Sequence, residues 1–594
     1  MESIKTFSLL LLFIGLLLLA SCQSAQGSTP PPGGEPSLTF TPSTEAGQEL
    51  SAKQAIESTP VPADPQPTPA RTRPALMAAR PTPTPRPPTP DPGRARGGEV
   101  VVGALGHPDT LNPLLAESDA GRALVPLLFD SLLAFDPMSG QLTPRLAEEW
   151  RVSSDSRTIT FTLHSGARWH DGQPLTADDV VFSIQAARDP AQDSLYGPTL
   201  NHVLAVDAPD NKTVIVRLDV AHCPSLAALG ELPIVPQHLL ENSEVNPTAF
   251  GDAPVGSGPF AFEGWTPAGE LRLTRHDGYW GGAPFLDAWS YRAYDSLPEL
   301  QQALENGEID AAMLPPGHLP ATADLEAAYS AYYYPAPEYE FVAFNNDHPV
   351  LRDARVRRAL SLAIDREQLV QQVLHGNGEL MAASLPALHW TADTALQPPP
   401  YNPDEARQLL AEAGWSDSDG DGWLDRDGER LRMPVRTNGG NRLREGLASL
   451  VASYYRAIGV DASVELVAWG ALVDDIFTHD FGMLVFGWPL RAEPDQSRWW
   501  LSTQDEIGSG DNFVSFSDRR VDRLLQEAAT ASACESGERA EAYRQIQHAL
   551  AEERPYDFLL IPYATVLTRP ELRGLVAGPF AGPLTSAAKW HIAP

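Results

Sequence analysis

Residues 158–163, TITFTL, alternate strictly between threonine and apolar side chains. A period of two with β-branched residues predicts a strand that is buried on one face. Farther along, Thr176 is followed three residues later by Asp179, and an apolar run comes next. This spacing predicts a helix that begins with a capping box.

The chain beyond residue 97 repeats this alternation of strand-like and helix-like segments. Apolar runs predict strands at 98–103, 460–467 and 483–488, and a pair of strands at 556–568. A period near 3.6 predicts a helix at 443–459. Strands that alternate with helices indicate the α/β class.

The turn after the first of these strands carries His170 and Asp171, so we considered a metal or catalytic pair. Asp171-Gly172 is a common turn sequence, and Trp169 beside it is expected to pack in the core. A metal or triad site needs several convergent groups, and no third ligand lies at a useful spacing. We expect a structural role.

Three arginines, Arg355, Arg357 and Arg358, interrupt the apolar period of another predicted helix. They have the charge to bind an anion. A solvated helix face is the interpretation we favour, because charged residues opposite an apolar stripe normally face water.

The first 22 residues are typical of a secretory leader. An apolar run from Phe7 to Ala20 ends in Leu19-Ala20-Ser21-Cys22, which resembles a bacterial lipobox. Cleavage there makes Cys22 the lipidated first residue, anchored to the membrane without spanning it. The alternative is a plain signal peptide with a chance cysteine.

Residues 23–97 hold 18 of the chain's 56 prolines, among Thr, Ser, Gly and Ala. Such a composition cannot bury a core, so we predict a disordered, extended spacer. The formal net charge of the whole chain is −34. An acidic body excludes nucleic acid and an anionic lipid surface as expected partners.

Two cysteines remain in the body, Cys223 and Cys534. They could pair in an oxidising compartment. We expect two buried free thiols, because buried unpaired cysteine is common.

An Asp/Gly-rich segment runs from Asp417 to Asp425 and resembles a calcium loop, with oxygen ligands at alternate positions. Gly428 stands at the twelfth position, where such loops need a bidentate glutamate. We therefore expect no metal here.

Several blocks of sequence resemble one known family. They are LTPRLAEEW at 142–150, RWHDGQPLTADDVVFS at 168–183, VGSGPFAFEGW at 255–265 and RHDGYWGGAPFLD at 275–287. Their residue order is similar to the extracellular solute-binding proteins of family 5, the peptide, oligopeptide and nickel receptors of ABC importers. The resemblance implies an α/β, two-lobed periplasmic-binding-protein-like fold of class II, in the large cluster with an extra subdomain.

The resemblance also implies a division of the body, residues 98–594. Lobe one is expected at 98–141, 251–340 and 556–594, an inserted subdomain at 142–250, and lobe two at 341–555.

The function implied is capture of a peptide or related small solute between the lobes and its delivery to an ABC permease and ATPase complex. We expect a lipid-anchored monomer on the extracytoplasmic face of the bacterial membrane, with no catalysis and no cofactor. One alternative is a surface hydrolase of sugars or peptides that uses paired acids such as Glu493 and Asp495. Another is a sensor co-receptor of the same fold.

In the family's peptide binders, two tryptophans of lobe two line the cleft, and Trp469 and Trp488 occupy the matching positions. Each could instead belong to the core. Asn112, Glu117 and Asn441 lie on turns and are further candidates for cleft contacts, with ordinary turn roles as the alternative.

One position departs from the family's pattern. Family members that grip a peptide's amino terminus have an aspartate three residues after the Gly-Trp pair, where this chain has Arg491. A guanidinium repels an ammonium group and binds carboxylate or phosphate. We therefore expect an anionic, uncharged or N-blocked ligand, unless Arg491 faces solvent or Glu493 takes the acid's role.

Overall fold

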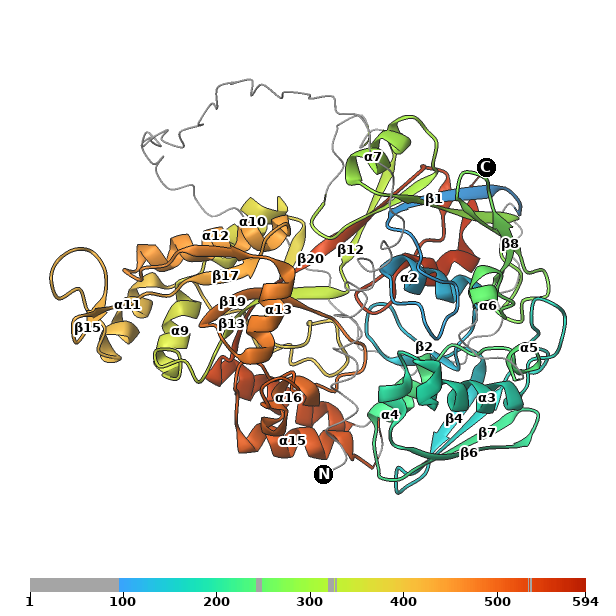
Figure 1. The fold of residues 1–594 in the computed structure, drawn as a ribbon, viewed down its shortest axis with the longest axis horizontal. Coiled ribbons are helices and arrows are strands. Elements are labelled where there is room, and N and C mark those ends of the chain that lie inside the picture. Colours follow the sequence, from blue (N-terminus) through green and yellow to red (C-terminus); the bar gives the residue numbers. More distant parts are fainter. Residues whose placement is uncertain are drawn as a thin grey trace, which may run out of the picture. The chain divides into compact units, whose positions relative to one another are not determined.

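The computed structural model describes residues 96–241, 248–318, 325, 328–532, 534 and 537–593. The predicted leader, Cys22 and nearly all of the predicted spacer lie outside the described residues. The longest sheet has twelve strands (Figure 1), ten of them in the order β18-β17-β19-β13-β20-β11-β1-β10-β9-β8, with β12 and β14 also paired to β20. Their bounds are β1 (Glu99–Leu105), β8 (Phe260–Trp265), β9 (Leu271–Arg275), β10 (Ala288–Tyr294), β11 (Ala311–Leu314), β12 (Ser330–Pro335), β13 (Glu338–Phe344), β14 (Gly378–Leu380), β17 (Val435–Asn438), β18 (Val464–Val467), β19 (Met483–Pro489) and β20 (Tyr556–Thr568).

A second, antiparallel sheet has the order β4-β5-β7-β6 and lies within residues 142–250. It consists of β4 (Ala147–Val152), β5 (Thr158–Leu163), β6 (Val203–Asp210) and β7 (Thr213–Leu218). Three two-stranded antiparallel sheets are β2–β3 (Leu133–Phe135, Leu142–Pro144), β15–β16 (Asp425–Arg426, Glu429–Arg430) and β21–β22 (Leu572–Arg573, His591–Ile592).

Helices surround the sheets. They are α2 (Asp119–Leu128), α3 (Ala177–Arg188), α4 (Pro224–Glu231), α5 (Gln237–Leu240), α6 (Thr248–Asp252), α7 (Leu297–Glu305), α9 (Ala354–Leu362), α10 (Arg366–Leu374), α11 (Pro403–Glu412), α12 (Arg442–Ala457), α13 (Trp469–Thr478), α14 (Ser497–Trp500), α15 (Arg519–Ala529) and α16 (Gly537–Glu553), with 3-10 turns at Pro190–Gln192, Gly197–Leu200, Ser502–Gln504 and Pro583–Lys589. No helix among the described residues is both long and apolar enough to cross a membrane.

The buried residues fall into two groups of cores, which define two lobes. Lobe one is built on cores between Val100 and Leu325, with the C-terminal segment from Leu567 to Trp590 and the side chain of Cys534. Lobe two is built on two cores between Tyr339 and Ile561. The two-lobed α/β fold predicted from the sequence is confirmed.

Strand β20 corrects one prediction. Residues 556–568 form a single strand of thirteen residues, not a pair. Its first half pairs with β13 of lobe two and its second half with β11 and β12 of lobe one. Pro562 does not interrupt the strand, because its carbonyl accepts a hydrogen bond from the amide of Ala336.

The strand-turn-helix segment has the predicted structure. β5 alternates between buried and half-buried residues, and Trp169 is fully buried. The carboxylate of Asp179 accepts a hydrogen bond from the Thr176 amide at 2.9 Å, as a capping box requires. His170 accepts from the Gly256 amide through Nδ1 and contacts the Gly258 carbonyl through Nε2, both at 3.1 Å. The histidine therefore has a structural role.

The arginines of α9 correct a second prediction. Arg355 and Arg358 are exposed, but Arg357 is only 3% exposed. Its guanidinium donates to the carbonyls of Leu351 and Glu553, the latter at the C-terminus of α16. A cation is favourable at a helix C-terminus, where carbonyls lack partners, and the helical period alone could not reveal that neighbour.

The cysteines correct a third prediction. Cys223 and Cys534 form a disulfide, with their Cα atoms 5.0 Å apart. They are 311 residues apart in sequence. Their proximity is created by the packing of the N-terminus of α4 against the connection between α15 and α16, so the expectation of free thiols was wrong.

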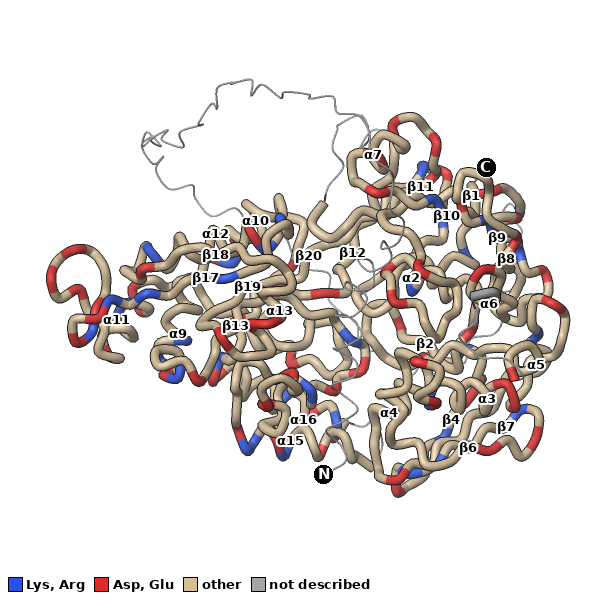
Figure 2. The backbone as a smooth tube through the Cα atoms, viewed as in Figure 1, with Lys and Arg blue, Asp and Glu red and all other residues tan. Residues whose placement is uncertain are grey.

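Acidic residues are spread over both lobes rather than gathered in one patch (Figure 2). The Asp417–Asp425 segment leads into the β15–β16 hairpin, and the carboxylates of Asp417, Asp419 and Asp421 lie within 4.8 Å of one another. Asp417 accepts from two loop amides, and Asp421 pairs with Arg430. These carboxylates already have partners within the loop, so their closeness does not require an ion.

Candidate functional site

Lobe two presents an aromatic cluster at the end of β19. The Trp488 indole is half-buried and donates from Nε1 to the hydroxyl of Tyr556 at 3.2 Å. Phe486 lies between the two predicted site tryptophans, edge-on to Trp488 at 5.2 Å and stacked on Trp469 at 6.1 Å between ring centroids. Trp469 begins α13 and is 55% exposed. The cluster therefore ends in an aromatic face that is open to a ligand.

A buried ion pair supports this cluster. Arg444 of α12 donates from Nε to both carboxylate oxygens of Glu340, at 3.0 and 3.2 Å, and its guanidinium lies 4.7 Å over the Phe486 ring. Burial raises the pKa of Glu340 to about 7, although Arg444 opposes that rise. A Cβ on Gly487 would lie 2.6 Å from Glu340 and 2.7 Å from Arg444. The glycine before Trp488 is therefore required by the close approach of this pair.

The predicted turn residues have turn roles. Asn441 is the N-cap of α12 and accepts from the Arg444 amide at 3.1 Å, so it positions the helix that carries Arg444. Asn112 is 1% exposed, and its Oδ1 accepts from the Leu114 amide at 3.2 Å. Glu117 is exposed just before α2, and its amide donates to Asp109 at 2.8 Å. Of the three, only Glu117 presents an exposed side chain.

Arg491 lies two residues beyond β19 and keeps an exposed side chain. The group that acts on it from lobe one is Glu231, the last residue of α4 and also exposed. Desolvation by the protein around Glu231 raises its pKa to about 7, while the charge of Arg491 lowers it and that of Glu493 raises it. Water reaches both side chains, so this electrostatic coupling is screened. The charges of Arg491 and Glu231 thus act on each other from different lobes.

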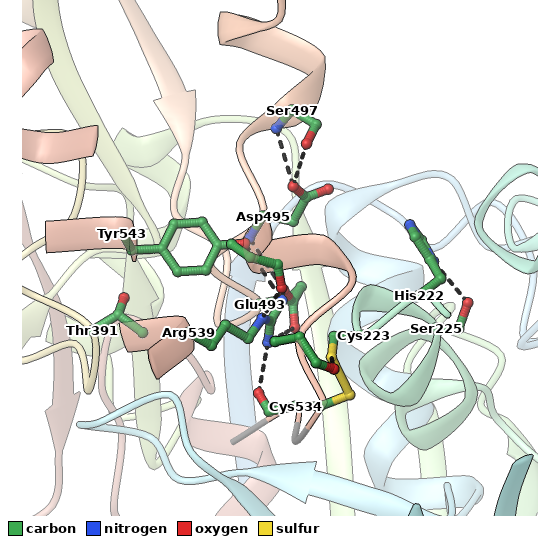
Figure 3. A network of polar contacts seen from close by, with 12 residues as sticks. His222, Cys223, Ser225, Thr391, Glu493, Asp495, Ser497, Cys534, Arg539 and Tyr543 are labelled. Carbon is green, nitrogen blue, oxygen red and sulfur yellow. Dashed lines mark hydrogen bonds and ion pairs between the residues drawn. A yellow bond between two sulfur atoms is a disulfide. The ribbon is translucent and has the colours of Figure 1, made fainter. Parts of the chain in front are cut away.

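Glu493 and Asp495, the paired acids of the hydrolase alternative, already have partners (Figure 3). Glu493 forms an ion pair with Arg539, whose side chain is 3% exposed. Asp495 accepts from the hydroxyl of Ser497 at 2.6 Å and from its amide at 3.2 Å. Burial raises the pKa of Glu493, and Arg539 opposes the rise. These interactions support neither paired-acid hydrolysis nor a role for Glu493 as the acid that grips an ammonium group.

Sequence reasoning missed Glu231, Phe486 and the Arg444–Glu340 pair. One signal was present: Glu340 interrupts the apolar run of β13, and an acid inside a buried strand needs a partner. The identity of that partner was not encoded locally, since Arg444 is 104 residues away.

A buried histidine beside this loop gives the protein a pH dependence. His389 is 3% exposed, donates from Nε2 to the carbonyl of Ala492 at 2.9 Å and accepts from the Thr391 amide through Nδ1. Burial lowers its pKa to about 4. The imidazole is protonated below about pH 6.5 in the unfolded chain but only below about pH 4 in the folded protein. The free energy of unfolding therefore falls as the pH is lowered through this window.

We expect His389 alone to remove about 2 kcal/mol of unfolding free energy between pH 7 and pH 4.5. Urea unfolding of the wild type and of His389→Gln at both pH values measures this contribution, because glutamine keeps a donor without titrating. Equal losses in the two proteins would show that His389 does not carry the effect.

Comparison with known proteins relates this architecture to one family. The model for bacterial extracellular solute-binding proteins, family 5 Middle, matches residues 141–509. The oligopeptide-binding protein AppA of Bacillus subtilis is 31% identical over 508 residues, covering 84% of this chain and 92% of AppA. The structure of AppA with a nonapeptide is 30% identical, with a TM-score of 0.65, and covers 84% of this chain and all of that one. NikZ of Campylobacter jejuni with Ni(L-His) is 26% identical, with a TM-score of 0.69 and coverage of 83% and 99%.

Proposed function

Because the chain belongs to the bacterial extracellular solute-binding proteins of family 5, we propose that it captures a small solute between its lobes and delivers it to an ABC permease. The observation that supports this most strongly is a junction at which the lobes meet, where Phe135 and Ala227 of lobe one form an apolar cluster with Ala492 of lobe two. On the chain beside it, Arg491 of lobe two and Glu231 of lobe one carry opposite charges that act on each other, and lobe two also presents the exposed face of Trp469. Aromatic faces with a few polar groups are typical of solute sites.

The ligand we propose is a peptide-like solute without a free ammonium group at the Arg491 end. AppA is described with a nonapeptide and NikZ with Ni(L-His), so the family's fold accommodates different ligands. The exposed guanidinium of Arg491 favours an anionic, uncharged or N-blocked group, with stacking on Trp469 and Trp488. Glu231 is an acid, with its charge coupled to Arg491, that an ammonium group could use instead.

Calorimetric titration with di- to pentapeptides, their N-acetylated copies and oligosaccharides tests the ligand class. We expect acetylation to preserve or strengthen binding, and Arg491→Asp to create binding of free peptides. Glu231→Gln is the matched control: tight binding of free peptides that is lost both on acetylation and in Glu231→Gln would show that Glu231 grips the ammonium group, and the proposal would fail.

The anchor is a second part of the proposal and rests on Leu19-Ala20-Ser21-Cys22. We expect Cys22→Ala to release the protein from the membrane fraction or to leave it unprocessed, because the lipid supplies the apolar burial that holds it there. Fractionation and metabolic lipid labelling measure this outcome, with Ser24→Ala as a control that should remain anchored. If Cys22→Ala still acquires lipid, the lipobox interpretation is wrong.

A further inference from the structure

The Cys223–Cys534 disulfide joins elements that belong to different lobes (Figure 3). Cys223 precedes α4 and packs in the main core of lobe one. Cys534 lies between α15 and α16, whose apolar faces build a core of lobe two, while its own side chain packs into the core of lobe one. The disulfide is therefore a covalent cross-link between the two lobes and not one within a single lobe.

Noncovalent contacts accompany the bond across the same junction. The Cys223 amide donates to the carbonyl of Ala529 at 2.7 Å, and the Ser156 hydroxyl donates to the carbonyl of Ala531 at 2.9 Å. Nearby, Phe135 and Ala227 of lobe one form a small apolar cluster with Ala492 of lobe two. The C-terminus of α15 is thus docked onto lobe one at several points.

Arg539 makes the lobe-two side of the junction stiff. It donates to the carbonyls of Ala528 and Cys534, both at 3.1 Å, and pairs with Glu493 on the loop that follows β19. Through Arg539, the carbonyl of Cys534 is therefore linked to α15 and to the loop that carries Arg491. A force on the disulfide acts on these elements together.

Within the described residues, the backbone passes from one lobe to the other at two places. One is the link from β12 to β13, and the other is β20, to which both of those strands pair. Adjacent strands that cross between lobes act as a hinge, about which lobes open and close. A third connection, made by elements other than these strands, restricts that rotation.

We propose that the Cys223–Cys534 disulfide tethers α4 to lobe two and limits how far the lobes separate. The tether keeps Glu231, at the far end of α4, close to Arg491 even without ligand. The proposal rests on the two-lobed fold and not on the ligand, so the ligand titrations can fail without affecting it.

Hydrogen exchange followed by mass spectrometry on the full chain without ligand tests the tether. The reporter is the Trp390 amide of lobe two, which donates to the Ser139 carbonyl of lobe one at 3.1 Å and does not involve the disulfide. In wild type reduced by a phosphine, and in Cys223→Ser/Cys534→Ser, we expect the Trp390 peptide to exchange about tenfold faster or more. Peptides from the β13–β19 ladder within lobe two should not change.

Two controls separate opening from general damage. Arg523→Ala, at an exposed position of α15, should leave Trp390 protected, and the phosphine should not change exchange in the double variant. If the reduced wild type has both thiols free by mass, retains its circular dichroism and protects Trp390 as before, the tether proposal is overturned. Unfolding of the reduced wild type would overturn it as well, because a bond that the folded state cannot lose does not act as a limit on the separation of two folded lobes.

Discussion

Removing the disulfide is expected to lower the free energy of unfolding by about 4 kcal/mol. The bond closes a sequence separation of 311 residues, and a cross-link over so long a loop removes many conformations from the unfolded chain. Urea unfolding of the wild type, with and without reductant, and of Cys223→Ser/Cys534→Ser measures the difference. The folded state should survive, since domains of this kind retain a margin of several kcal/mol.

Reductant should not change the unfolding free energy of the double variant, which controls for effects on any other group. A loss below about 1 kcal/mol would mean that contacts in the unfolded chain already bring the two segments together, as happens when a denatured state keeps residual structure. In that case the chain-entropy account would not apply to this bond.

Arg444→Ala is expected to destabilise the protein by about 3–5 kcal/mol. The side chain of Glu340 is 1% exposed, and the substitution leaves its carboxylate buried without a counter-ion. Burial already raises the pKa of this acid to about 7. Without Arg444 the pKa rises further, so the folded state binds a proton that the unfolded state has released, and the loss should be larger at pH 8 than at pH 5.

Unfolding curves of Arg444→Ala at the two pH values measure the effect. Arg442→Ala, an exposed arginine on the same helix, should change stability by less than about 0.5 kcal/mol. Adding Glu340→Gln to Arg444→Ala should restore part of the loss and remove the pH dependence. An equal loss at pH 5 and pH 8 would mean that Arg444 acts through its packing on Phe486 rather than through charge.

The local patterns predict the correct secondary structure where a few neighbouring residues decide it. The alternation in TITFTL specified a half-buried strand, and Thr176 with Asp179 specified a helix start. The Asp171-Gly172 turn and the burial of Trp169 beside it were also predicted from neighbouring residues alone. Period, capping and turn chemistry act over two to four residues, so the sequence alone contains the information.

Longer blocks of residues placed the chain in its family, and with it the two-lobed fold. The sequence also singled out Trp469, Trp488 and Arg491 as candidates, but their surroundings came from the structure. Trp469 remains exposed, whereas Trp488 is tied to Tyr556 and is partly a core residue. Whether these residues bind the solute stays a prediction.

The sequence by itself determined the α/β elements, the acidic body and the departure at Arg491. The tertiary structure decided the pairings that join distant segments: Cys223 with Cys534, Arg444 with Glu340, Arg357 with the end of α16, and the single strand β20 that serves both lobes. Each depends on packing between elements 100 to more than 300 residues apart. These contacts form only when the cores bring the distant elements together. No local period or spacing in the sequence predicts them.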